Sequence, residues 1–118
     1  MQEFKHRAFN ELFDLSGQTA IVTGGANGIG KATALRLAQA GANIAIADLK
    51  LEDAKAAVKD VEVYGVKGLA VECNILKDDD LVAMVDKVRA EFGTINILIN
   101  NAGGGGGGRA RGRTAGAV

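Results

Sequence analysis

Short apolar runs alternate with segments of helical periodicity along most of this chain. Four runs of four to seven residues are too short for helices and are typical of buried parallel strands: residues 19–22, 43–48, 67–73 and 95–99. Between them, apolar residues recur at intervals of three and four, which predicts three helices. The expected apolar stripes are Ile29, Ala32, Leu35 and Ala38; Ala54, Ala57, Val58, Val61 and Tyr64; and Leu81, Met84, Val85, Val88 and Phe92.

Strands that alternate with helices predict a parallel sheet covered on both faces. With right-handed crossovers this gives a three-layer α/β fold of strand order 3-2-1-4. We expect it to occupy residues 19–103, after an arm at residues 1–18 that either forms a short amphipathic helix or lies across the domain or a neighbouring subunit. Residues 104–118 are mostly glycine, arginine and alanine, and cannot recover the roughly 1–2 kcal/mol per residue that ordering costs. We expect this tail to be disordered.

A glycine-rich turn at residues 23–30 joins the first predicted strand to the first predicted helix. Glycines allow a sharp turn and let an anion approach the unpaired N–H groups at the helix N-terminus, where the helix dipole favours negative charge. This context favours a dinucleotide-binding site. The alternative is an ordinary tight turn between a strand and a helix.

The second predicted strand ends in an acid, Asp48, 18 residues beyond Gly30. In a βαβ dinucleotide site, a carboxylate at this position accepts hydrogen bonds from the adenosine ribose and repels a 2′-phosphate. The sequence therefore predicts NAD rather than NADP, although Lys50 could offset part of the repulsion. Alternatively, Asp48 begins a turn or caps the next helix.

Two motifs together identify a family resemblance. The pattern T-G-x-x-x-G-x-G is matched by Thr23, Gly24, Gly28 and Gly30, and N-N-A-G is matched by residues 100–103. Over residues 13–103 the chain resembles the short-chain dehydrogenase/reductase family, which implies a Rossmann-like fold, here truncated. The resemblance implies NAD contacts from Gly24, Asn27, Gly28, Ile29, Gly30, Asp48, Leu49, Asn74, Ile75, Asn101 and Gly103.

Asn74 follows the third predicted strand, where the resemblance implies an acid or, less often, an asparagine that accepts a hydrogen bond from the adenine amino group. The backbone amide of the next residue, Ile75, would meet the adenine ring. The alternative for Asn74 is a purely structural role in a turn.

The resemblance also implies a serine and a Tyr-x-x-x-Lys pair on further chain, and neither has a match here. The only tyrosine, Tyr64, has Gly68 at the lysine position, and the only serine, Ser16, precedes the first strand. We therefore expect no catalytic residue and no activity from this chain alone. The hypothesis is the NAD(H)-binding portion of an oxidoreductase that interconverts an alcohol and a ketone by hydride transfer, in a truncated or frame-shifted reading. The alternative is a non-catalytic interaction protein that self-associates through its exposed fourth strand.

The charge and hydrophobicity of the chain argue against nucleic-acid binding and membrane association. Three of the 14 basic residues lie at positions 109–113, so residues 1–102 carry 14 acidic and 11 basic side chains and offer no basic surface for nucleic acid. The three tail arginines make RNA binding a distant third hypothesis. No apolar run approaches the roughly 20 residues needed to span a bilayer, and no signal peptide is recognisable. We expect a soluble, cytoplasmic protein with no membrane partner.

Three candidate metal or redox features have simpler explanations. His6 has no second ligand at a useful spacing and is expected to be solvated. The run at residues 78–80 consists of aspartates that suit the start of a helix better than a cation site. Cys73 is the only cysteine, which excludes an internal disulfide and fits a small buried residue on a strand. We expect no metal site.

Overall fold

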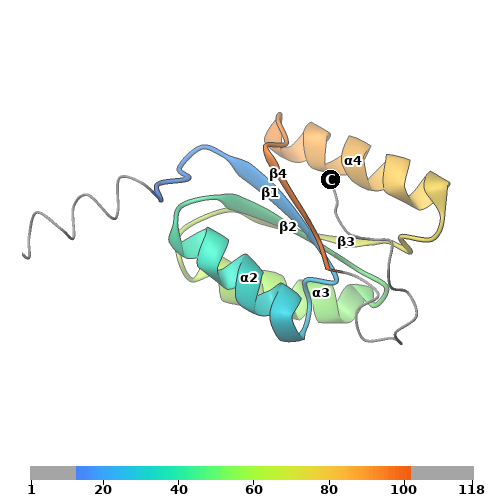
Figure 1. Ribbon diagram of the computed structural model, residues 1–118, viewed down its shortest axis with the longest axis horizontal. Coiled ribbons are helices and arrows are strands. Elements are labelled where there is room, and N and C mark those ends of the chain that lie inside the picture. The colour runs from blue at the N-terminus through green and yellow to red at the C-terminus, as the bar shows by residue number, and fades with distance from the viewer. Residues whose placement is uncertain (1–12, 102–118) are drawn as a thin grey trace, which may run out of the picture.

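The computed structural model describes residues 13–101, and its elements alternate as the sequence predicts (Figure 1). They are β1 (Thr19–Thr23), α2 (Gly28–Gln39), β2 (Asn43–Asp48), α3 (Leu51–Glu62), β3 (Gly68–Glu72), α4 (Asp78–Phe92) and β4 (Ile97–Asn100). The predicted tail, His6, Gly103 and most of the predicted arm lie outside the described residues.

The four strands form one parallel sheet of order β3-β2-β1-β4, which confirms the predicted order. Helices α2 and α3 lie on one side of the sheet and α4 on the other, so the three-layer arrangement is also confirmed (Figure 1). From β1 the chain adds β2 and then β3 on one side, and it then crosses over to place β4 on the other side of β1, so the direction of strand addition reverses between β1 and β4. Ligands of such sheets bind outside the carboxyl ends of the strands at this switch point.

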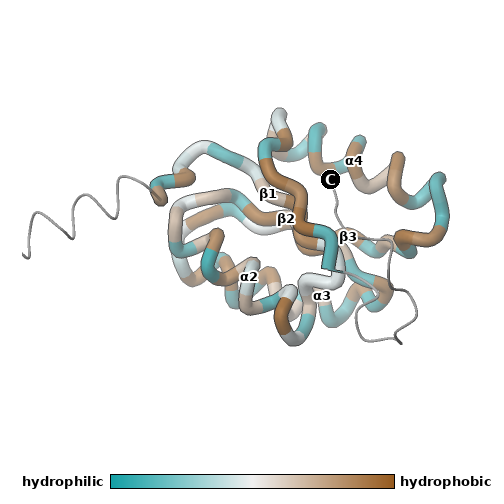
Figure 2. Tube along the Cα trace, viewed as in Figure 1, coloured by the Kyte–Doolittle hydropathy of each residue, from teal (hydrophilic) through white to brown (hydrophobic). Residues whose placement is uncertain are grey.

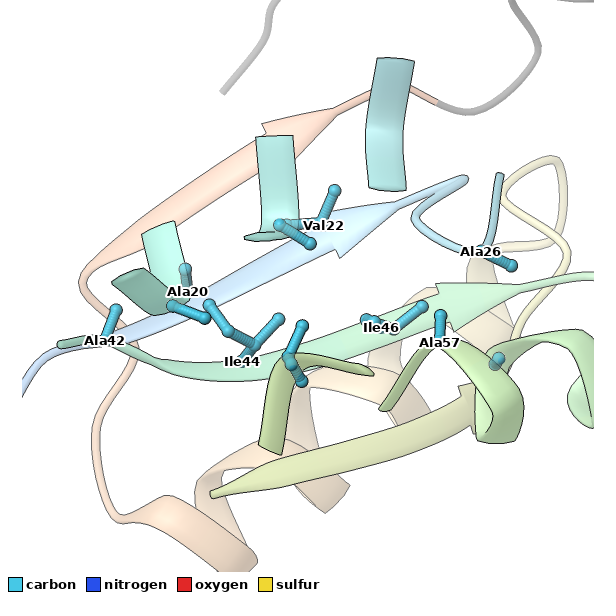
Figure 3. Close-up of a cluster of buried hydrophobic side chains, with 11 residues drawn as sticks. Ala20, Val22, Ala26, Ala42, Ile44, Ile46 and Ala57 are labelled. Carbon is cyan, nitrogen blue, oxygen red and sulfur yellow. The ribbon is translucent and has the colours of Figure 1, made fainter. Parts of the chain in front are cut away.

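Apolar side chains concentrate on the strands, while the helices mix apolar and polar positions (Figure 2). On the side of α2 and α3, Ile44 and Ile46 of β2 are fully buried against small residues (Figure 3). Among these small residues are Ala20, Ala34, Ala38, Ala54 and Ala57. Alanines let both helices approach the sheet closely, so the bulky isoleucines fill the layer between them.

The opposite face of the sheet forms a second, smaller cluster with α4. Ile21, Ala45 and Val71 from three strands pack with Met84 and Val88. The stripe predicted for α4 is therefore confirmed as core. In the described part of the chain, no helix is both long and apolar enough to cross a bilayer.

The apolar stripe predicted for α2 is wrong at its start. Ile29 is 77% exposed and Ala32 is exposed, whereas Gly30, Ala34 and Ala38 form the buried face. The buried residues recur every four positions and are all small, because the helix must lie close to the sheet and to the turn before it. Hydrophobicity alone points to the larger Ile29, but close approach selects the smaller residues.

Two further details differ from the sequence prediction. Tyr64 lies beyond the end of α3 and is 44% exposed, where its hydroxyl accepts a hydrogen bond of 3.1 Å from Gln39 Nε2. Cys73 is buried as predicted but follows β3 rather than lying within it. Both residues stand at the ends of regular elements, where periodicity carries least information.

Strand β4 is an edge of the sheet within the described residues, as predicted. Its side chains alternate, with Ile97 and Ile99 half-buried and Leu98 41% exposed. The outer backbone groups of β4 have no neighbouring strand among residues 13–101. An exposed apolar edge of this kind is a place where another strand can pair.

Candidate dinucleotide-binding site

The glycine turn lies at the carboxyl end of β1, at the switch point of the sheet. Gly24 and Gly28 have positive φ angles of 64° and 58°, which side chains rarely adopt. The Gly24 N–H donates to the carbonyl of Ala47 at 2.8 Å, which attaches the turn to β2. The turn therefore depends on glycine for its path and on β2 for its position.

Gly30 has no room for a side chain. A Cβ at this position would lie 2.1 Å from the carbonyl oxygen of Gly24 and 2.7 Å from Nδ2 of Asn101. The first turn of α2 thus packs directly on the backbone that precedes it. This contact brings the helix N-terminus to the ends of both β1 and β4.

The first two residues of α2, Gly28 and Ile29, are exposed, whereas Gly30 is buried. The cap residue, Asn27, has extended backbone and makes no side-chain cap hydrogen bond. Among the described residues, none accepts a hydrogen bond from the N–H of Gly28, Ile29 or Gly30, whereas the N–H of Lys31 is bound to the Asn27 carbonyl at 3.2 Å. Such N–H groups and the positive end of the helix dipole form an anion-binding geometry.

Asp48 lies against this turn. Its Oδ2 accepts a hydrogen bond of 3.3 Å from the Ala26 N–H, and its Oδ1 accepts one of 3.2 Å from the Lys50 N–H. The carboxylate therefore connects the glycine turn to the start of α3, and it shapes the turn after β2 as the alternative interpretation proposed. Leu49, beside it, is 64% exposed.

Thr23 joins the two sequence motifs. Its hydroxyl donates to Oδ1 of Asn100 at 2.9 Å and accepts from the N–H of Asn101 at 3.0 Å. Nδ2 of Asn101 also reaches the Gly24 carbonyl at 3.4 Å. The ends of β1 and β4 are thus held together beside the glycine turn, although they lie 77 residues apart in sequence.

Sequence reasoning missed Thr23, Ala26 and Asn100 as parts of the site. The signal for two of them was present, since Thr23 opens the first motif and Asn100 opens the second. Ala26 contributes only its backbone N–H, so no side-chain pattern marks it.

We predict that Thr23→Val lowers the free energy of unfolding by about 1–2 kcal/mol, because Asn100 loses a donor and the Asn101 N–H loses an acceptor. Thr33→Val is the matched control, since its hydroxyl donates only to the Ile29 carbonyl on an exposed helix surface. Urea unfolding followed by circular dichroism measures both. Equal effects of the two substitutions would contradict the joining role of Thr23.

Asn74 has a structural role in this fold. Its Oδ1 accepts a hydrogen bond of 3.0 Å from the Leu76 N–H, which closes a turn, and its own N–H donates to Oδ2 of Asp80 at 2.9 Å. An amide oxygen has a second lone pair, so the hydrogen bond from Leu76 does not by itself use up the acceptor expected to meet the adenine amino group. Ile75, next in the chain, is half-buried.

The aspartates at residues 78–80 open α4, as predicted. Among residues 13–101, no group of three or more metal-binding side chains comes together. The Asp80 carboxylate also accepts a hydrogen bond from the Asn74 N–H, a role for these aspartates that the sequence did not indicate.

Cys73 directly follows the carboxyl end of β3 and is 2% exposed. Its N–H donates a hydrogen bond of 2.9 Å to the carbonyl of Asp48. Burial raises the pKa of its thiol above the ordinary value of 9.0, and the nearby Asp80 carboxylate raises it further. The thiol is therefore poorly suited to act as a nucleophile.

This raised pKa predicts a loss of stability in alkali. The unfolded thiol ionises at a lower pH than the folded one. The contribution of the Cys73 thiol to the free energy of unfolding is therefore complete below about pH 9 and is lost as the pH rises above that value. We expect Cys73→Ala to reduce this alkaline loss. Urea unfolding of both proteins from pH 7 to 10 tests it, and parallel pH profiles would contradict it.

The only tyrosine and the only serine of the sequence both lie away from the site, in line with the expectation that neither is catalytic. Tyr64 follows α3 and Ser16 precedes β1, so both lie toward the amino ends of the strands. The Ser16 hydroxyl donates to Oδ1 of Asp14 at 2.6 Å, which also lowers the pKa of the Asp14 carboxyl. The glycine turn and Asp48 stand at the opposite edge of the sheet.

Comparison with known protein families shows to which family this chain belongs. A family model described as short chain dehydrogenase matches residues 18–115. The chain belongs to this family. Short-chain dehydrogenases are oxidoreductases that bind nicotinamide cofactors. In this chain the glycine turn, Asp48 and the Asn100-Asn101 pair lie together at the carboxyl ends of the strands.

Individual relatives agree with this assignment. The chain is 42% identical over 94 residues to 2-dehydro-3-deoxy-D-gluconate 5-dehydrogenase from Formosa agariphila, covering 79% of this chain and 36% of that protein. Among solved structures it resembles a hydroxysteroid dehydrogenase from Escherichia coli, with a TM-score of 0.76 and 37% identity over 80% of this chain and 40% of the other. It also resembles an NAD⁺-bound xylitol dehydrogenase, with a TM-score of 0.73 and 38% identity over 75% and 34% of the two chains.

The chain spans only about a third of the length of the curated relatives that it matches. The shared part is the sheet with its glycine turn, which accounts for the agreement in fold.

Proposed function

We propose that this chain is the NAD(H)-binding portion of a cytoplasmic short-chain dehydrogenase that interconverts an alcohol and a ketone. The observation that carries the proposal is the Asp48 carboxylate held against the glycine turn by the Ala26 N–H. This arrangement sets an acceptor for ribose hydroxyls beside N–H groups suited to a diphosphate.

The described residues fit such a cofactor. The backbone of Gly24, Asn27, Gly28, Ile29 and Gly30 would hold the diphosphate, and Asp48 and Leu49 would meet the adenosine. Asn74 and Ile75 would contact the adenine, and Asn101 would lie toward the nicotinamide half; Gly103 belongs to the same proposal but lies outside the described residues. Bound NAD would supply the hydride acceptor, and this chain's residues would bind and orient it.

Titration with NADH, followed by its fluorescence, tests the proposal. We expect saturable binding by the full chain, checked for native secondary structure by circular dichroism. A folded sample without saturable binding would refute it. We do not expect alcohol oxidation by this chain alone, because among residues 13–101 no serine or tyrosine lies at the carboxyl edge of the sheet.

A second candidate is a non-catalytic interaction protein that self-associates through β4. Leu98 is 41% exposed on an edge strand, which favours this alternative. Light scattering over a dilution series distinguishes it, since a lasting monomer excludes strand pairing between copies. Neither proposal involves a membrane or nucleic-acid partner.

A further inference from the structure

Asn27 and Gly28 form the only Asn-Gly pair in the sequence, and the structure places this pair at the exposed opening of α2. The Asn27 side chain is exposed and makes no cap hydrogen bond. Gly28 is exposed, with a φ of 58°, and apart from its two chain neighbours and the backbone of its own helix no atom lies within 4 Å of the position that a Cβ would take. The carboxamide and the backbone nitrogen that follows it are therefore both accessible.

We propose that Asn27 is a site of spontaneous deamidation in the folded protein. The Gly28 backbone nitrogen gives its proton to a solvent base and attacks Cγ of Asn27. A bond forms between this nitrogen and Cγ, Nδ2 takes a proton from solvent as the bond from Cγ to Nδ2 breaks, and ammonia leaves. Water then opens the resulting succinimide at either carbonyl, giving aspartate or isoaspartate at position 27.

Three features of the site favour this reaction over ordinary amide stability. The Gly28 N–H has no acceptor among the described residues, so its proton is free to leave. The positive end of the α2 dipole stabilises the nitrogen anion that forms. The exposed Asn27 side chain makes no cap hydrogen bond, so it can turn toward the Gly28 nitrogen; the extended Asn27 backbone, with ψ at 163°, must also rotate, which breaks the hydrogen bond from the Lys31 N–H to the Asn27 carbonyl.

Asn43 provides an internal control. It begins β2, its Oδ1 accepts a hydrogen bond of 3.0 Å from the Lys67 N–H, and a β-branched residue, Ile44, follows it. Its carboxamide is held, and its neighbouring nitrogen belongs to the sheet. The same chemistry is therefore blocked at Asn43.

The aspartate product would retain the fold but change the site, whereas isoaspartate would lengthen the backbone of the turn by one methylene. A carboxylate at the cap position is as good a helix cap as asparagine and interacts favourably with the helix dipole. It also places negative charge beside the N–H groups that would hold a diphosphate. Loss of cofactor affinity in this form rests on the proposed function, whereas the deamidation itself does not.

The first experiment measures the modification alone. The folded full-length chain is aged at mildly alkaline pH, and its peptides are followed by mass spectrometry, with isoaspartate detected by isoaspartyl methyltransferase labelling. We expect conversion at Asn27 to be about tenfold faster than at Asn43, since glycine leaves the nitrogen unshielded. The Asn27→Ser chain, which keeps a capping residue, should lack the modified peptide. Equal rates at the two asparagines, or conversion of Asn27 only in urea, would overturn the proposal.

The second experiment tests the consequence. The Asn27→Asp chain should unfold at the same temperature as the parent or higher, and should bind NADH roughly five- to tenfold more weakly because of charge repulsion. Unchanged NADH affinity would refute the functional consequence. If freshly made parent chain shows no NADH binding while Asn27 still deamidates, the proposed function fails and the modification site stands.

Discussion

Replacing Gly30 by alanine is expected to lower the free energy of unfolding by about 3 kcal/mol, because the atom that the new Cβ would overlap most is a backbone carbonyl oxygen, which cannot turn aside as a side chain can. The overlap is with the Gly24 carbonyl oxygen, 2.1 Å away, and with Nδ2 of Asn101 at 2.7 Å. To relieve it, α2 must move away from the ends of β1 and β4. Urea unfolding of the variant measures the loss of stability.

Gly28→Ala is the matched control for this change. It adds the same methyl group two residues earlier, where the space is open and only the positive φ opposes it. That strain costs about 1–2 kcal/mol. We expect the Gly30 variant to be the less stable of the two, and the reverse order would contradict the close packing of α2 on the turn.

Under the proposed function, Asp48→Asn is expected to raise the affinity for NADPH relative to NADH by about tenfold, since it removes a negative charge that would face the additional phosphate. Asparagine keeps an oxygen that can accept from the Ala26 N–H, so the turn should keep its position. Alanine would remove both the negative charge and the acceptor for the Ala26 N–H, so a change in cofactor preference could not be separated from a change in the turn. Competitive titrations with the two reduced cofactors give the affinity ratio.

Asp86→Asn is the control for the cofactor ratio. It removes the same charge from an exposed position on α4, on the opposite side of the sheet from α2 and α3. Its ratio of NADPH to NADH affinity should equal that of the parent chain. An unchanged ratio in Asp48→Asn would refute the proposed role of this carboxylate in cofactor choice.

Local patterns predicted the elements well. Each strand in the described chain is a short apolar run, and Gly41 and Gly93 have the positive φ angles expected where a helix ends. The apolar stripe of α4 forms core because its large residues face the sheet, and no other described helix packs on that face. Periodicity succeeds in such cases because burial on one face is a property of neighbours along the same helix.

The same reasoning failed for the buried face of α2. Ile29 is more hydrophobic than Gly30, yet Gly30 is buried and Ile29 is exposed. The rotation of this helix is fixed by its contact with the Gly24 carbonyl and Asn101. Those partners lie on the turn and just after the end of β4, about 70 residues away, so the window of a single helix could not reveal them.

The sequence by itself determined the alternation of strands and helices, the glycine turn, and the acid at the end of the second strand. Only the tertiary structure decided that Asp48 binds the Ala26 N–H, that Thr23 joins Asn100 to Asn101, and that Asn74 closes a turn. The physical reason is distance along the chain. Secondary structure follows from neighbouring residues, whereas the site forms where strand ends that are far apart in sequence meet at one edge of a parallel sheet.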